Sequence, residues 1–260
     1  SIRRQRQMCI RDRVTGMHNG TEAGKSFDEA ALKRRRTLLI VAGSIIVVIL
    51  LAVAFVPLAL GGLFGNGVKT EGIDESRLKA ADTPLDGHWE VSSRPGPNGS
   101  SAGFTFFEIL PGQEKVTSGS TEGVSGSADI EAGTLTAGEI TVDMTNLTSD
   151  SDVRDSNVRR KILHTDQFPE ATFRVTEPGD VSQVPDDGSV AKVELTGEMT
   201  IHGETNTVTH EFDVARSGSS LIVAGDVPIN RADYGVESPE FVAAKIDEQG
   251  EVNIRLNMHQ

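Results

Sequence analysis

Apolar and polar residues alternate with a period of two along much of the second half of the chain. Between positions 193 and 201, Val193, Leu195, Gly197, Met199 and Ile201 are interleaved with glutamate and threonine. Successive side chains of a strand point to opposite faces, so this pattern predicts a strand with one apolar face. The same pattern predicts further strands over residues 140–144, 208–214, 221–229 and 252–258.

Short turn signals separate these apolar series. Glycine stands beside polar residues at 131–133, 185–188, 202–204 and 217–219. Tight turns join antiparallel neighbours, whereas parallel strands need long crossovers. Eight or so antiparallel strands predict either a sandwich or a closed barrel.

One helix is expected to interrupt the strands, at residues 153–163. Ser149 and Ser151 are N-cap candidates before it, and the basic run 159–161 suits the negative C-terminal end of a helix.

A different pattern occupies residues 38–60, which contain no charged side chain and follow the basic run 33–36. At ~1.5 Å per residue such a helix spans roughly 34 Å, enough to cross a ~30 Å hydrocarbon core. We expect a single-pass cell-membrane anchor whose helix spans 37–62. Its uncharged run begins at Leu38 and ends at Leu60. The basic flank predicts a cytoplasmic N-terminus and an extracytoplasmic C-terminal domain. A cleaved signal peptide is the alternative, but the run is about twice the usual ~7 to 15 residue apolar region.

Charge and composition divide the rest of the chain. Residues 1–36 hold ten basic and four acidic residues and form a basic tail, whereas the remainder holds 15 against 34, a net charge of −19. Residues 1–16 resemble translated sequencing-adapter sequence and receive no functional weight; Met17 is a plausible start. Residues 63–84 are glycine-rich and then charged, which predicts a flexible linker. The domain is expected at 85–260.

Several function classes are disfavoured by these residues. The acidic domain argues against nucleic acid, whose phosphates need a basic surface. Cys9 is the one cysteine, so the domain is expected to fold without disulfides. The histidines show no metal-ligand spacing, and no nucleophile elbow or phosphate loop is present. The sequence therefore predicts neither an enzyme nor a cofactor, and it does not predict an oligomeric state.

Four segments together resemble the YceI-like domain family. They are GHWEV at 87–91, RD at 154–155 followed by FPEATF at 168–173, GEMTIHGET at 197–205, and NRADYG at 230–235. The resemblance covers essentially 85–260, and the longer opening of the domain resembles membrane-anchored actinobacterial members. It implies an extended, lipocalin-like antiparallel β-barrel whose apolar cavity holds a long isoprenoid-type lipid. The resemblance to the lipocalin Gly-x-Trp also implies that Trp89 closes the base of the barrel against Arg255; the alternative is that Trp89 is an ordinary core aromatic residue.

The candidate ligand contacts are residues expected to face the barrel interior or its mouth. They are Phe104, Phe106, Glu108, Ile140, Val142, Arg154, Arg159, Phe173, Leu195, Met199, His210, Phe212 and Val223. Two assignments remain open. His210 lies on an apolar face, either as a satisfied core residue or as a partner, with Glu108, for a ligand head group. The basic helix either complements its own dipole or clamps an anionic head.

The leading hypothesis is a membrane-tethered binding module for a polyisoprenoid or quinone. Its main alternative is an envelope interaction module whose barrel is filled by its own side chains. An enzyme is the third and least favoured possibility.

Overall fold

The computed structural model describes residues 39–41, 43–47, 68–110, 113–237 and 245–260, and the chain divides into two units, Ser1–Phe64 and Gly65–Gln260. In the first unit, residues 39–41 and 43–47 are helical. Among the described residues, no helix has the length and apolar character that a membrane span requires. The predicted anchor at 38–60 lies largely outside the described residues and stays a prediction.

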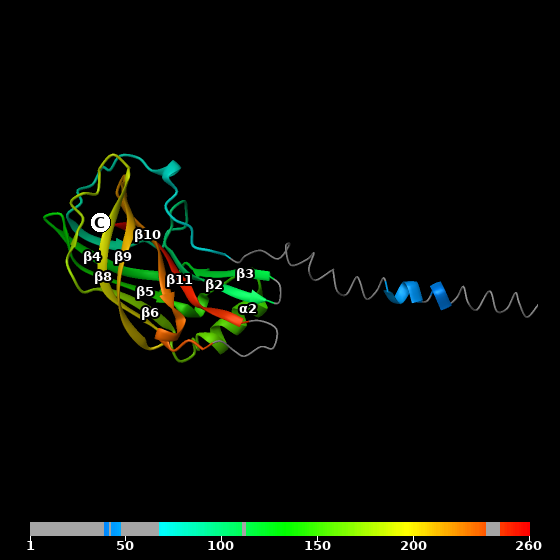
Figure 1. Cartoon of the computed structure of the whole chain (residues 1–260). Helices are drawn as coiled ribbons and strands as arrows, with labels where there is room; N and C mark the ends of the chain where they lie inside the picture. The colour runs from blue at the N-terminus through cyan, green and yellow to red at the C-terminus, as the bar shows by residue number, and fades with distance from the viewer. Residues whose placement is uncertain (1–38, 42, 48–67, 111–112, 238–244) are drawn as a thin grey trace, which may run out of the picture. The chain divides into compact units, whose positions relative to one another are not determined.

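The second unit is built almost entirely of antiparallel strands (Figure 1). The strands are β1 Gly87–Val91, β2 Ser101–Leu110, β3 Gln113–Thr121, β4 Val124–Glu131, β5 Thr134–Asp143, β6 Glu170–Val175, β7 Gly179–Asp180, β8 Val190–Ile201, β9 Glu204–Ser217, β10 Ser220–Asn230 and β11 Lys245–His259.

Eight of these strands close into a barrel, which confirms the predicted fold and decides against a sandwich. Their order is β1-β4-β5-β6-β8-β9-β10-β11, and β11 pairs again with β1. Closure depends on the length of β11. Its end pairs with β1 through Met258 and His259, while its earlier part pairs with β2, so the β2–β3 hairpin extends the sheet beside the barrel.

The period-two pattern correctly predicts which side chains point inward. Val193, Leu195, Met199 and Ile201 of β8 are all buried in one core. The intervening Gly197 has a specific role, because a Cβ there would lie 2.5 Å from the Phe173 ring. A side chain is excluded at that point, so the ring lies directly against the barrel wall.

The predicted helix is also confirmed. It begins as α2 Asp152–Asn157 and continues as a π-helical turn, Val158–Ile162. Ser151 is the N-cap residue, without a side-chain cap bond. The preceding loop is held by buried Asp155, which accepts hydrogen bonds from the backbone N–H of Ser149 at 2.7 Å and from its hydroxyl at 2.5 Å. Short 3-10 helices at Glu75–Arg77, Met144–Asn146 and Arg231–Tyr234 complete the unit.

Residues 68–84, which we call the strap, run along the outer wall of the barrel. The Val68 amide donates to the Ser118 carbonyl of β3 at 3.3 Å, and the Asp82 amide donates to the Gly218 carbonyl at 2.9 Å. Arg216 donates to the Thr83 carbonyl at 2.7 Å. The composition that predicts a linker gives no sign of these contacts, because they use backbone groups of distant strands.

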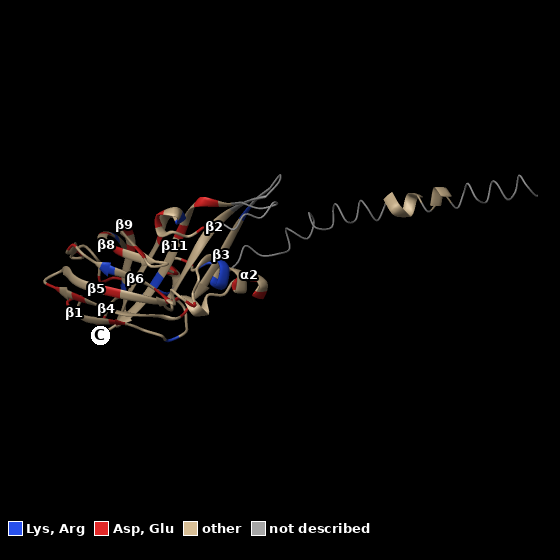
Figure 2. Cartoon of the chain, turned by 90° about the horizontal axis from the view of Figure 1, so that it is seen from below, with Lys and Arg blue, Asp and Glu red and all other residues tan. Residues whose placement is uncertain are grey.

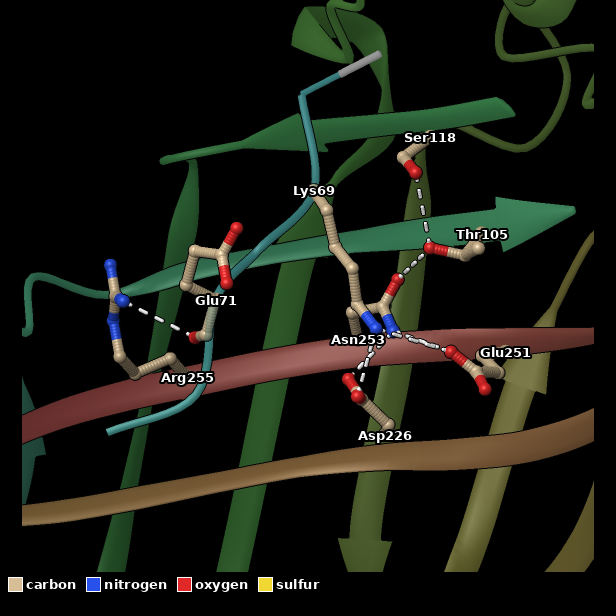
Figure 3. Close-up of polar contacts among 8 residues, drawn as sticks. All are labelled: Lys69, Glu71, Thr105, Ser118, Asp226, Glu251, Asn253 and Arg255. Atoms are coloured by element: carbon tan, nitrogen blue, oxygen red, sulfur yellow. Dashed lines mark hydrogen bonds and ion pairs between the residues drawn. The ribbon is translucent and has the colours of Figure 1, made fainter. Parts of the chain in front are cut away.

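A polar network beneath the strap fixes it to β2, β10 and β11 (Figure 3). Asn253, with 0% of its surface exposed, accepts a hydrogen bond from Thr105 at 2.6 Å and donates to Asp226 at 2.7 Å and Glu251 at 3.2 Å. Lys69 of the strap pairs with the same two carboxylates at 2.9 and 3.3 Å. Partial burial opposes the charged form of Lys69, but the hydrogen bond and charge of Asp226, aided by Glu251, outweigh it and raise the pKa of Lys69.

Candidate ligand-binding site

The barrel encloses an apolar cavity at the end where β11 finishes, which we call the inner cavity. Its volume is about 100 Å³. Of the residues predicted from sequence, six line it: Ile140, Phe173, Leu195, Met199, Phe212 and Val223. The Phe173 and Phe212 rings lie 6.3 Å apart between their centroids. A Cβ at Gly225 would approach the Phe212 ring to 2.7 Å, so this ring too lies against a glycine of the wall.

A second, middle cavity of about 60 Å³ lies between β2, β5, β6 and β11. Phe104, Phe106 and Val142 line it, as the sequence predicts for inward-facing side chains. The Phe104 and Phe106 rings are 5.3 Å apart between centroids. Val252 of β11 lines both this cavity and the inner one, so the two cavities are neighbours at this side chain.

A third, outer cavity of about 350 Å³ lies beneath α2 and the π-helical turn. It shares Phe104, Phe106 and Arg231 with the middle cavity. Its other lining residues include polar ones, among them Arg154 and Glu237. The lining therefore changes from apolar inside the barrel to mixed at the helix.

The three cavities follow one another along β11. Met258 lines the inner cavity, Val252 the inner and middle cavities, and Ile246 the outer cavity. A strand advances about 3.3 Å per residue, so the series extends over roughly 35 to 40 Å. This arrangement suits a long, thin, apolar molecule with one polar end.

Two arginines line the outer cavity, and each is held by neighbouring groups. Arg154 forms an ion pair with Asp150 across one helical turn. Arg231 donates from Nε to the Asp247 carbonyl at 3.0 Å and from Nη1 to the Val236 carbonyl at 2.7 Å. Arg231 thus fixes the chain after β10 and also faces the cavity.

Tyr234 lines the middle cavity behind Arg231. Burial raises the pKa of its hydroxyl, and the charge of Asp233 adds to that effect. The phenol is therefore neutral near pH 7.

Two predicted contacts are not brought into these cavities. Arg159 donates to the Leu147 carbonyl at 2.9 Å and is absent from the lining of the outer cavity. The half-buried His210 packs edge-on against Phe212, 5.1 Å between ring centroids, and is absent from the lining of the inner cavity. The Glu108 side chain lies outside the described residues.

The expected pairing of Trp89 with Arg255 is wrong. Trp89 is 1% exposed and donates its indole N–H to the Leu85 carbonyl at 2.9 Å. Arg255 belongs to the outward face of β11, where it donates to the carbonyls of Gly99 at 2.9 Å and of Glu71 and Gly72 at 3.2 Å. Trp89 is therefore a buried core residue of β1, whereas Arg255 holds the strap.

Within the described residues, no three histidine, cysteine or acidic side chains are grouped so that they could hold a metal ion.

A family model described as the YceI-like domain matches residues 95–258, more than half of the chain. Similar solved structures include a polyisoprenoid binding domain from Saccharophagus degradans, at 18% identity and a TM-score of 0.46 over 62% of this chain and 97% of that one. Burkholderia cenocepacia BcnA is 19% identical, with a TM-score of 0.46 over 60% and 95%. A Campylobacter jejuni YCEI protein is 12% identical, with a TM-score of 0.41 over 74% and 100%. No curated protein matches the sequence.

Proposed function

Because this chain belongs to the YceI-like domain family, we propose that it binds a long isoprenoid-type lipid, such as a polyprenyl chain or an isoprenoid quinone, along the cavities of its barrel. The observation that carries the proposal is the series of three cavities that share walls along β11. A filled barrel would leave no such series, and a catalytic site would need a cluster of reactive groups that the lining does not supply.

The energetics of binding follow from the lining. Burying an apolar chain contributes about 0.8 kcal/mol per CH2 without any directional contact. The inner and middle cavities therefore need only apolar walls of the right width. Selectivity for thin, branched chains would come from the aromatic rings of Phe104, Phe106, Phe173 and Phe212, which define that width.

The polar end of the ligand is placed in the outer cavity. Arg154 and Arg231 supply guanidinium groups there, and Arg154 is oriented by its ion pair with Asp150. A guanidinium group matches a phosphate geometrically, so a phosphate-bearing head is the best fit. Of the two arginines predicted as ligand contacts, Arg154 is kept as a contact of the head group and Arg159 is not. Arg231 is added as a second contact of the head group.

The test compares two arginines of the same helix. Arg154→Gln should weaken a polyprenyl phosphate roughly tenfold to a hundredfold more than the matching polyprenol, since only the charged head loses a charge-assisted bond of ~1.5 to 3 kcal/mol. Arg159→Gln is the matched control, because Arg159 bonds the Leu147 carbonyl and does not line the outer cavity. Equal losses for phosphate and alcohol in Arg154→Gln would contradict the head-group assignment.

The same proposal places the domain outside the cytoplasm, tethered through residues 38–60 as a single-pass anchor. Support comes from the uncharged run and its basic flank. A tethered carrier would hold or deliver a lipid beside the bilayer that supplies it.

A further inference from the structure

We propose that the end of the domain carrying the β2–β3 hairpin and α2 docks onto the surface of an anionic lipid bilayer, so that the outer cavity opens at that surface. The docking rim consists of Val68, Phe107, Val153, Arg160 and Lys161. Docking rests on the surface chemistry of the rim and does not itself require a bound ligand.

The first observation concerns exposed apolar side chains. In the part of Gly65–Gln260 that the structure describes, three large apolar side chains are exposed: Val68 at 47%, Phe107 at 38% and Val153 at 72%. Each stands beside one short stretch of β3. Phe107 pairs in register with Val116, Val153 lines the outer cavity together with Thr117, and Val68 bonds to Ser118. Of the three, Val153 lines the outer cavity, whereas Phe107 follows the cavity-lining Phe106 and so points to the other face of β2. Exposed apolar side chains at one end of a domain are typical of an interaction site.

The second observation is the charge next to this rim. The chain after residue 36 is strongly acidic, yet Arg160 and Lys161 are adjacent and exposed on the π-helical turn. Figure 2 shows basic residues, in blue, on the ribbon beside α2. Within the described residues, neither forms an ion pair or a side-chain hydrogen bond, whereas Arg154 and Arg159 of the same helix are both engaged. Free cations beside apolar side chains fit an anionic lipid surface, where each cation contributes to attraction.

The third observation is the length of chain before the rim. Seven residues, 61–67, separate the end of the uncharged run from Val68. A fully extended chain spans at most ~3.6 Å per residue, so Val68 stays within roughly 30 Å of the end of that run. If the run crosses a bilayer, Val68 and the β3 backbone to which it bonds are held near the surface. The tether therefore raises the effective concentration of the rim at the membrane.

Docking would give the bound lipid a route that avoids water. A ligand entering through the outer cavity would leave the bilayer past Val153 and meet the apolar middle cavity next. This consequence rests on the proposed function, whereas the docking itself can be tested alone.

The experiment uses the full chain in vesicles of mixed neutral and anionic phospholipid, with Cys9→Ser removing the natural thiol. A fluorescent label on Val153→Cys should be quenched by nitroxide-bearing lipids. The matched control is Gln183→Cys, an exposed position next to Val181 and Val184 at the inner-cavity end, which should stay unquenched. Both sites are exposed, so labelling should leave the fold intact. Absent quenching at Val153, or equal quenching at both sites, would overturn the proposal.

A second variant tests the charge. Arg160→Gln with Lys161→Gln should lower the ratio of docked to undocked protein by roughly tenfold or more on anionic vesicles, and leave it unchanged on neutral ones. An unchanged ratio on anionic vesicles would overturn the assignment of an anionic surface. Polyprenol binding measured on Arg160→Gln with Lys161→Gln reports on the proposed function separately, because Arg160 and Lys161 line none of the three cavities.

Discussion

Val252→Trp should block the passage between the middle and inner cavities. Val252 is the residue that lines both, and it faces Val227 of β10 and Phe104 of β2 in register. An indole at this position would fill the junction, so the end of a long ligand could no longer enter the inner cavity. A short ligand that ends in the middle cavity should still bind.

The size of the effect follows from the inner cavity. An empty apolar cavity costs ~24 cal/mol per Å3, and the inner cavity measures about 100 Å³. Filling it with ligand is therefore worth about 2.4 kcal/mol, or roughly a 50-fold change in Kd. The substitution itself costs about 1 to 3 kcal/mol through overpacking, which the domain should tolerate.

The assay is competition binding with polyprenols of increasing length, together with thermal melting of each variant. Long chains should lose about 50-fold in affinity for Val252→Trp and short chains should lose little. Thr207→Trp is the control. Thr207 is exposed on β9, so this substitution adds the same indole outside the barrel. The reasoning fails if Val252→Trp melts as a folded protein yet binds long and short chains with unchanged affinity.

Three further outcomes are expected. Met199→Asp should destabilise the domain by several kcal/mol in urea melts, because Met199 is 6% exposed and faces the inner cavity. The control, Met199→Leu, should cost less than about 1.5 kcal/mol. Equal stability of the two variants would mean that Met199 does not face the barrel interior. Hydrogen bonds from the Thr145 hydroxyl, the Thr145 backbone N–H and the Asn146 side-chain amide lower the pKa of Asp143 below its ordinary 3.8. The stabilisation that the Asp143 carboxylate gives to the folded state is therefore present above the unfolded-state pKa and is lost as pH falls through the folded-state pKa. Asp143→Asn should therefore flatten the loss of stability below about pH 4, and an unchanged acid slope would refute this assignment. Protease added to intact cells should remove the barrel and spare the N-terminal tail, while a protected barrel would end the extracytoplasmic proposal.

The strands and their inward faces could be predicted because alternation reports side-chain direction directly. Val193 to Ile201 shows this, as every second residue of the series lies in the core or against a ring. The same parity excludes Arg255 as a partner for Trp89. Arg255 is one position from Leu256, which lines the inner cavity, and so it must face outward.

The residues at the mouth were harder to predict. Arg154 and Arg159 read alike in the sequence, but one lines the outer cavity and the other bonds a loop carbonyl. Arg154 belongs to α2, whereas Arg159 belongs to the π-helical turn that begins at Val158, and the sequence has no recognised signal for that change of helix type. The strap was missed for a related reason. Its contacts join backbone groups to strands far along the chain, and its composition matches a linker.

The central claim is that the barrel holds a long apolar lipid in its cavities. Native mass spectrometry of the full chain released from lipid nanodiscs, compared with Val252→Trp prepared in the same way, tests it most directly. The account predicts one long-chain isoprenoid-type lipid per barrel in the native protein and its loss or shortening in the variant. A native barrel without lipid, or the same lipid retained equally by both proteins, would contradict it.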